Sequence, residues 1–216
     1  MDKIINTLDR RDENRKSGLI SRLLLVCTLL CFCAAGQAAQ FYQDGIAYFF
    51  INGTDVVEVR DNHQQTYKGE IVIPAEVTYK SVVYTVNALS YQTFYCCKEV
   101  TSVTLPESII EIGELAFSEC SGLTSFIIPE KVEKMGRKAF FKCLNLEKVT
   151  IQGSVVGENA FFECPKLTEI HLSRSTPPQL NDSFENYTAT LYVPAGSKAN
   201  YQSAPGWKNF KKIVEE

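Results

Sequence analysis

The chain has 216 residues, of which 45% are hydrophobic, and its formal net charge is −3 at pH 7. This hydrophobic content is sufficient for a folded core, which excludes a disordered chain. The small negative charge argues against a nucleic-acid-binding protein, because such a domain would carry a clustered basic surface.

The first 38 residues have the composition of a secretory signal peptide. Residues 1–22 contain six basic and four acidic side chains, and an apolar segment follows over residues 23–35. As a helix this segment would span about 20 Å, whereas a hydrocarbon core is about 30 Å thick. The small residues Gly36 and Ala38 then favour cleavage after Ala38. The remaining chain would have no membrane span and a net charge of −5, because residues 1–38 sum to +2.

Two alternatives to a cleaved signal stay open. An uncleaved anchor would need a longer apolar span. A lipid-modified cysteine at Cys31 or Cys33 would need a small residue just before it, and Leu30 and Phe32 are large. In each case the body of the protein is exported.

Residues 41–86 have the pattern of β-structure. Asn52-Gly53 separates two apolar segments and is a strong hairpin signal, and a second hairpin is expected around Lys80-Ser81. Between them, residues 70–74 resemble the strand of the repeats described next. We therefore predict an N-terminal β cap over residues 39–69, which would cover the first edge of a repeat region.

One motif recurs four times in the middle of the chain. Its frame is Ala-Phe-x-x-Cys-x-x-Leu-x-x-(Val/Phe/Ile)-x-(Ile/Leu)-Pro, and the copies begin at Thr93, Ala116, Ala139 and Ala160. A fixed period in the twenties is typical of a leucine-rich repeat solenoid. We predict an α/β leucine-rich repeat solenoid over residues 70–189, rich in strands, with about four to six coils, short helical turns and a cap at each end.

Alternation assigns an inner and an outer face to each repeat strand. In the first full strand Val103 and Leu105 point inward, and each strand should lie about 4.8 Å from its equivalent in the next coil. Glycines recur four residues before the frame phenylalanine and should mark a corner with positive φ or close coil stacking. The phenylalanines should form one internal column; they are Phe94, Phe117, Phe140, Phe161 and Phe184.

The cysteines follow the repeat. Three of the eight lie in the leader, and four others occupy the frame position, namely Cys97, Cys120, Cys143 and Cys164, with Cys96 beside the first. Equivalent cysteines on adjacent coils could reach disulfide distance, but an odd total of five leaves one unpaired. A linear column does not form a tetrahedral zinc site. We interpret the frame cysteines as buried free thiols; the disulfide alternative stays open.

The last segment, 190–216, combines a strand with a cap. Leu191-Tyr192-Val193-Pro194 repeats the strand ending of the frame. Tyr201, Trp207 and Phe210 follow and should close the open end of the core. The alternative is that Trp207 anchors a ligand.

The frame and this tail together resemble the BspA-like branch of the leucine-rich repeat proteins over about residues 70–214. The resemblance implies an exported or cell-surface protein. Some members are adhesins that bind host matrix or other cells, and the family has no shared catalytic residues. The chain departs from the pattern at residues 86–90, where Ile-Gly is absent, and at Gln152 and Ser173, where proline is lost.

No pattern of catalytic residues is present, so we predict no enzyme activity, cofactor or metal. The two histidines, His63 and His171, are interpreted as isolated surface residues, without the positioned partner that a general base needs. Asn-x-Ser/Thr sites would be glycosylated only in a eukaryotic secretory pathway; they are Asn52, Asn181 and Asn186.

The outward strand residues form the candidate ligand face. One column consists of Val72, Thr104, Ile127, Thr150, His171 and Tyr192, and its neighbour includes Lys148 and Glu169. We predict a non-catalytic, adhesin-like module that binds an extracellular protein or glycan, such as host matrix, through this face. Two alternatives stay open: a solvated face without a site, and a structural surface solenoid that acts through self-association. The sequence does not indicate an oligomeric state.

Overall fold

The structure is a computed structural model, which describes residues 40–61, 67–185 and 187–216. These residues belong to one compact unit, Gln40–Glu216. The predicted leader, its cleavage position, His63 and Asn186 lie outside the described residues. No helix within the described ranges is long and apolar enough to cross a membrane.

The N-terminal part forms a sheet that continues into the repeats. Strands β1 (Gln40–Gln43), β2 (Ile46–Phe50) and β3 (Val56–Arg60) are antiparallel, and β5 (Glu76–Tyr79) pairs with β6 (Val82–Leu89). Both predicted hairpins are thus confirmed. Lys80 and Ser81 have positive φ, as a two-residue hairpin turn that follows strand twist requires. The sheet order is β1-β2-β3-β6-β8-β10, where β8 is Glu111–Ile112 and β10 is Lys134–Met135.

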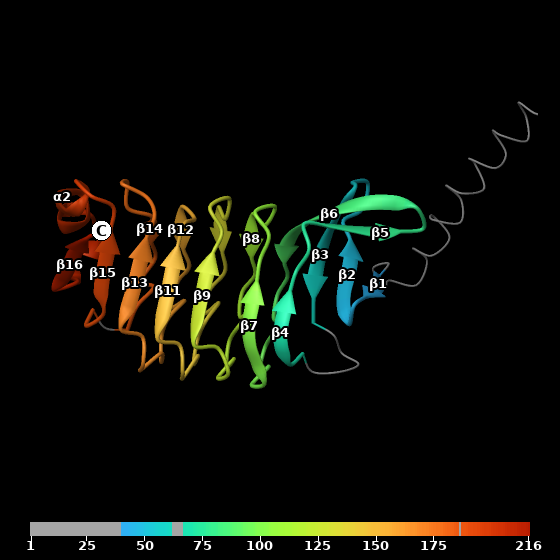
Figure 1. The fold of residues 1–216 in the computed structure, drawn as a ribbon, viewed down its shortest axis with the longest axis horizontal. Coiled ribbons are helices and arrows are strands. Elements are labelled where there is room, and N and C mark those ends of the chain that lie inside the picture. The colour runs from blue at the N-terminus through green and yellow to red at the C-terminus, as the bar shows by residue number, and fades with distance from the viewer. Residues whose placement is uncertain (1–39, 62–66, 186) are drawn as a thin grey trace, which may run out of the picture. The chain divides into compact units, whose positions relative to one another are not determined.

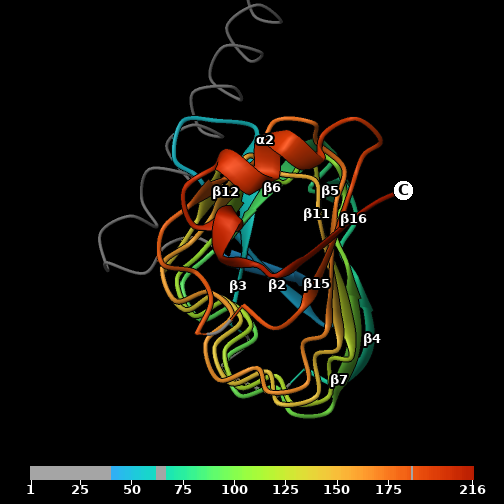
Figure 2. The same cartoon turned by 90° about the vertical axis from the view of Figure 1, so that its left-hand side faces the viewer.

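The repeat strands form parallel ladders along the stack of coils (Figure 1). Strand β4 (Gly69–Val72) pairs with β7 (Val100–Thr104). A separate five-stranded sheet has the order β16-β15-β13-β11-β9. Its strands are β9 (Ser125–Ile128), β11 (Lys148–Ile151), β13 (Glu169–Leu172), β15 (Thr190–Val193) and β16 (Lys212–Glu215). Another short parallel pair is formed by β12 (Val155–Val156) and β14 (Gln179–Leu180). The predicted solenoid is therefore confirmed, and Figure 2 shows its coils nearly superimposed along the stack.

Helix is sparse in this solenoid. In the part of the chain that the structure describes, it is confined to α2 (Lys198–Ser203) and the 3₁₀ turn η2 (Trp207–Asn209). The frame turns instead contain two left-handed residues per coil, such as Leu115 and Glu119. This backbone directs N–H groups to the next coil: Glu119 N donates to Phe141 O at 2.7 Å. The expected helical turns are thus replaced by a second ladder of hydrogen bonds between coils.

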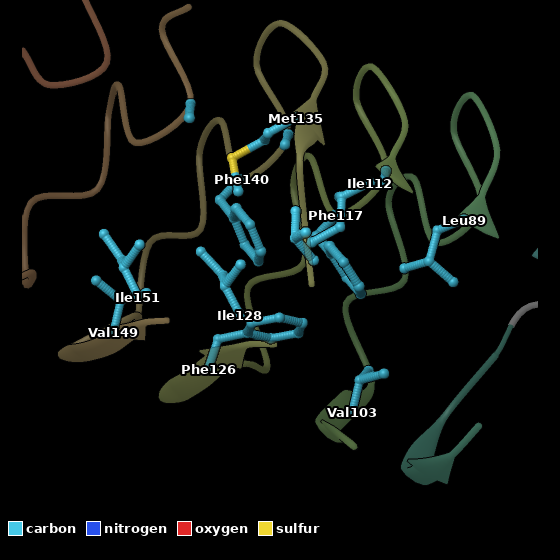
Figure 3. Packing of buried hydrophobic residues seen from close by; sticks show 14 of the residues in the cluster. Leu89, Val103, Ile112, Phe117, Phe126, Ile128, Met135, Phe140, Val149 and Ile151 are labelled. Atoms are coloured by element: carbon cyan, nitrogen blue, oxygen red, sulfur yellow. The ribbon is translucent and has the colours of Figure 1, made fainter. Parts of the chain in front are cut away.

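The phenylalanine column is confirmed. Consecutive rings from Phe94 to Phe184 stack with centroid distances of 5.0 to 5.2 Å and interplanar angles of 9 to 12°. Phe126 reaches across from its strand and lies 4.7 Å from both Phe117 and Phe140 (Figure 3). The core is therefore shared between coils, because each ring contacts the coil on either side.

The recurring glycines are explained by close stacking rather than by positive φ. Gly136 does not have positive φ, but a Cβ built on it would lie 2.5 Å from Glu114 Cα and 2.7 Å from Gly113 C. Gly113 and Gly157 meet the backbone of the preceding coil in the same way. A side chain at these corners would force neighbouring coils apart.

The frame cysteines are free thiols, as predicted, and their position has a structural cause. Cys120 Sγ lies 3.0 Å from Phe94 O in the preceding coil, and Cys143 and Cys164 repeat this contact at 3.1 Å. A thiol is small and can donate a weak hydrogen bond, so it fits a buried site that faces a carbonyl. Burial raises the pKa of Cys97 to about 11 and that of Cys164 to about 12.

We expect the native thiols to react slowly, because reaction requires the thiolate. The exported chain, unfolded without a reductant, should titrate as five thiols with a thiol-specific reagent. Eight thiols would mean that the leader and its three cysteines remain attached. A value of one would mean that the frame cysteines are paired, and it would contradict the free-thiol interpretation.

The C-terminal segment closes the stack with more structure than the sequence predicted. Trp207 is 1% exposed and donates from Nε1 to Pro178 O at 2.7 Å. Phe210 packs edge-on against Phe184, the last ring of the column, at 5.2 Å. Strand β16 then adds one further parallel strand beside β15, which the motif did not reveal.

Candidate ligand-binding face

The predicted outward column is divided between two sheets. Ile127, Thr150, His171 and Tyr192 lie in register across β9, β11, β13 and β15. Val72 and Thr104 are paired with each other in the separate β4–β7 sheet. The column also extends beyond the prediction, because Val214 of β16 lies opposite Tyr192. The larger sheet therefore carries the better-connected part of the candidate face.

This face is not uniformly polar. Ile127 is 58% exposed, and Val72 in the smaller sheet is 66% exposed. Thr150 and Tyr192 are half-buried, and the His171 side chain is 17% exposed. The column thus has an exposed apolar side chain, Ile127, at its β9 end. Towards β15 it has a more buried pair of rings, His171 and Tyr192.

His171 is not the isolated residue that the sequence indicated. Its ring stacks on Tyr192 with a centroid distance of 4.3 Å and an interplanar angle of 8°. Its Nδ1 lies 2.8 Å from Glu216 Oε1, and its Nε2 lies 3.4 Å from Glu169 Oε2. In-register parallel strands place equivalent side chains close enough for this stacking. The two rings and two carboxylates therefore form one ordered group.

The neighbouring column adds charge to this group. Lys148 Nζ lies 3.9 Å from Glu169 Oε2, so Glu169 sits between Lys148 and His171. Sequence reasoning found Lys148 and Glu169 by alternation but missed Glu216, which follows the unpredicted strand β16. The apolar Ile213 and Val214 before it were the available signal. Donors, acceptors and an aromatic pair thus lie together on one face.

The side chains of this face have the chemistry of a recognition surface. Among the described residues, no group of three or more His, Cys, Asp or Glu side chains could hold a metal ion. The strand face presents hydrogen-bonding groups beside rings and an exposed aliphatic side chain, which is the usual chemistry of recognition surfaces.

A hollow of about 350 Å³ lies elsewhere, next to β6 and β8. Its lining includes Ile51, Tyr91 and Ile110. The three lining carboxylates are all paired: Glu58 with Arg60, Glu111 with Lys134 at 3.7 Å, and Glu114 with Arg137 at 3.1 Å. The hollow thus offers polar and apolar contacts in similar measure.

The chain was compared with protein families and known proteins. Residues 87–200 match the family model described as "BspA type Leucine rich repeat region", with six copies of the repeat. No curated protein sequence matches the chain. The fold is shared with a leucine-rich repeat protein from T. pallidum, at 19% identity and a TM-score of 0.59, covering 82% of this chain and 83% of the other. It is also shared with a leucine-rich repeat protein from Bacteroides capillosus, at 22% identity and a TM-score of 0.54, covering 62% of this chain and 99% of the other.

Six repeat copies account for more than half of the chain, and the two solved structures have the same solenoid architecture. In the four copies of the motif, the frame phenylalanine and cysteine lie in the interior of the coil. This chain therefore belongs to the BspA type of leucine-rich repeat proteins.

Proposed function

We propose that this protein is an exported, non-catalytic module that binds an extracellular protein or glycan through the outward face of β9, β11, β13 and β15. Leucine-rich repeat proteins are binding modules, and solenoids commonly use an extended sheet surface for this purpose. The signal-like leader supports secretion or display at the cell surface. Host matrix is the partner class that the family resemblance favours.

The observation that carries the proposal is the His171–Tyr192 stack. Two carboxylates hold the His171 ring, at 2.8 and 3.4 Å, and the Tyr192 ring lies parallel to it. Side chains that are ordered before binding lose less conformational entropy when a partner docks. Exposed Ile127, on the same column, adds an apolar contact. A solvated face without a site would not require this order.

The alternative function, a structural solenoid that self-associates through its ends, receives less support. Strand β16 is at the edge of the five-stranded sheet, where a second molecule could add a strand. However, it is only four residues long and begins with Lys212, directly after Lys211. Short edge strands with lysines are a common protection against edge-to-edge pairing.

Replacing Ile127, His171 and Tyr192 together by serine should weaken binding by at least about tenfold, the usual effect of removing interface anchors. The measurement is binding of the purified protein to immobilised matrix proteins and to a glycan array. The control is Leu144→Ser, which removes an exposed apolar side chain in a turn outside the strand columns and should leave binding unchanged.

Circular dichroism should show that both variants keep the fold. Unchanged binding by the folded triple variant would reject the strand face as the site. Sedimentation velocity on the same samples tests the alternative: reversible self-association of the unmodified chain, without binding to any matrix protein or glycan, would favour the structural function.

A further inference from the structure

Four lysines surround a hollow on the C-terminal cap. Lys198 begins α2, Lys208 lies in η2, and Lys211 and Lys212 lead into β16. These elements meet at one end of the stack (Figure 2). The hollow has a volume of about 490 Å³ and is lined by Lys198, Gln202, Lys208, Phe210, Lys211, Lys212 and Ile213. A size of roughly 300–1,000 Å³ is usual for a ligand site.

The cap lysines differ in their ion pairing from several lysines and arginines of the coils. Lys134, Arg137 and Lys142 each pair with a glutamate of an adjacent coil, at 3.7, 3.1 and 3.8 Å. Among the described residues, no carboxylate forms an ion pair with any of the four lysines of the cap. Four like charges around one hollow repel each other, so an anion placed among them would be stabilised.

One carboxylate beside the cap contacts the backbone of α2 rather than an ammonium group. Glu215 Oε1 accepts a hydrogen bond from the backbone N–H of Lys198 at 2.9 Å. Its carboxylate therefore satisfies the first turn of α2. The ammonium groups of the cap remain available to an external ligand.

The shape of the hollow favours an acidic glycan over a membrane surface. Phe210 and Ile213 line it but are only 4% and 8% exposed, so they cannot insert into a lipid layer. The accessible groups around the hollow are instead polar: beside the lysines, Gln202 offers an amide to the hydroxyl groups of a sugar. Lysines clustered within a short segment, as in Lys208-Asn209-Phe210-Lys211-Lys212, are typical of sites for sulfated polysaccharides.

We propose that the C-terminal cap binds an acidic glycan, whose sulfate or carboxylate groups contact Lys198, Lys208, Lys211 and Lys212. This site borders the strand face, because Lys212 of β16 lies in register with Thr190 of β15, whereas Lys198, Lys208 and Lys211 lie outside the paired strands. The protein would thus hold a charged polysaccharide at its end, beside the partner that the sheet binds.

Heparin oligosaccharides test the proposal. The unmodified protein should bind them with an affinity that falls steeply as salt increases, because binding releases counter-ions. Replacing Lys198, Lys208 and Lys211 by glutamine should weaken binding at least about tenfold and reduce the slope of log K against log salt by about two to three. The control replaces Lys68, Lys98 and Lys131, three exposed lysines dispersed over the N-terminal coils, and removes the same charge. It should keep most of the affinity.

Two results would overturn the proposal directly. The first is that the unmodified protein fails to bind heparin at all, and the second is that the two triple variants lose heparin affinity to the same extent. Equal binding to polyglutamate, or to vesicles of phosphatidylcholine and phosphatidylglycerol in equal parts, would reduce the site to non-specific attraction. The strand-face variant separates the two proposals, because it should retain heparin binding. If it alone lost heparin binding, the cap would not be the site.

Discussion

Replacing Phe140 by alanine is expected to lower the free energy of unfolding by about 3–5 kcal/mol. The side chain is fully buried, and its ring lies 5.0 Å from that of Phe117 and 5.2 Å from that of Phe161. Phe126 contacts it from the strand side at 4.7 Å. Removing the ring leaves a cavity that three coils share, so no single coil can close it by a local shift.

The adjacent Phe141 provides a matched control. It is half-buried, and the ammonium groups of Lys138 and Lys142 lie 4.7 and 5.1 Å from the centroid of its ring. Phe141→Ala removes the same atoms but only surface contacts, and should lower the free energy of unfolding by no more than about 1 kcal/mol. Equilibrium unfolding in urea measures both variants. Equal losses would mean that the column is not the main source of stability.

The period of the repeat determined much of the fold in advance. Alternation placed Phe126 and Ile128 inside and Ile127 outside, and the recurring phenylalanines predicted the column. The conformation of the turns could not be predicted in the same way. Left-handed positions are occupied by residues such as Leu115 and Lys142, which have no intrinsic preference for positive φ. They adopt it because their own N–H groups then gain partners in the next coil: Leu115 N donates to Arg137 O at 3.1 Å, and Lys142 N to Phe162 O at 3.0 Å.

The candidate site was predictable in part, for a related reason. Alternation identifies which strand residues point outward, and it correctly placed His171 beside Tyr192. It does not reveal which additional strand lies next to them. Glu216 reaches His171 only because β16 pairs with β15, and this pairing depends on the fold of the cap. Alternation likewise does not reveal that β7 and β9 belong to different sheets, because strand pairing depends on how the coils stack.

Trp207→Ala is the second substitution with a large expected effect, a loss of about 3–5 kcal/mol in the free energy of unfolding. The indole lies 5.7 Å from the Tyr201 ring, 5.9 Å from Phe210 and 6.0 Å from Phe184. It therefore joins α2 and η2 to the last ring of the phenylalanine column. Without it the end of the core would be exposed, and we also expect aggregation during thermal unfolding, because solenoids depend on their terminal caps.

Trp207→Phe separates the two contributions of this residue. Phenylalanine keeps most of the apolar contact but cannot donate to Pro178 O, which Trp207 Nε1 contacts at 2.7 Å. The loss should therefore be smaller, about 1–3 kcal/mol, the usual effect of leaving a buried acceptor without its donor. Urea unfolding with heparin and matrix binding on the same samples decides the role of the tryptophan. If Trp207→Ala kept full stability but lost binding, Trp207 would be a ligand anchor. We expect the opposite, a loss of stability, because the indole is only 1% exposed and contacts three buried rings.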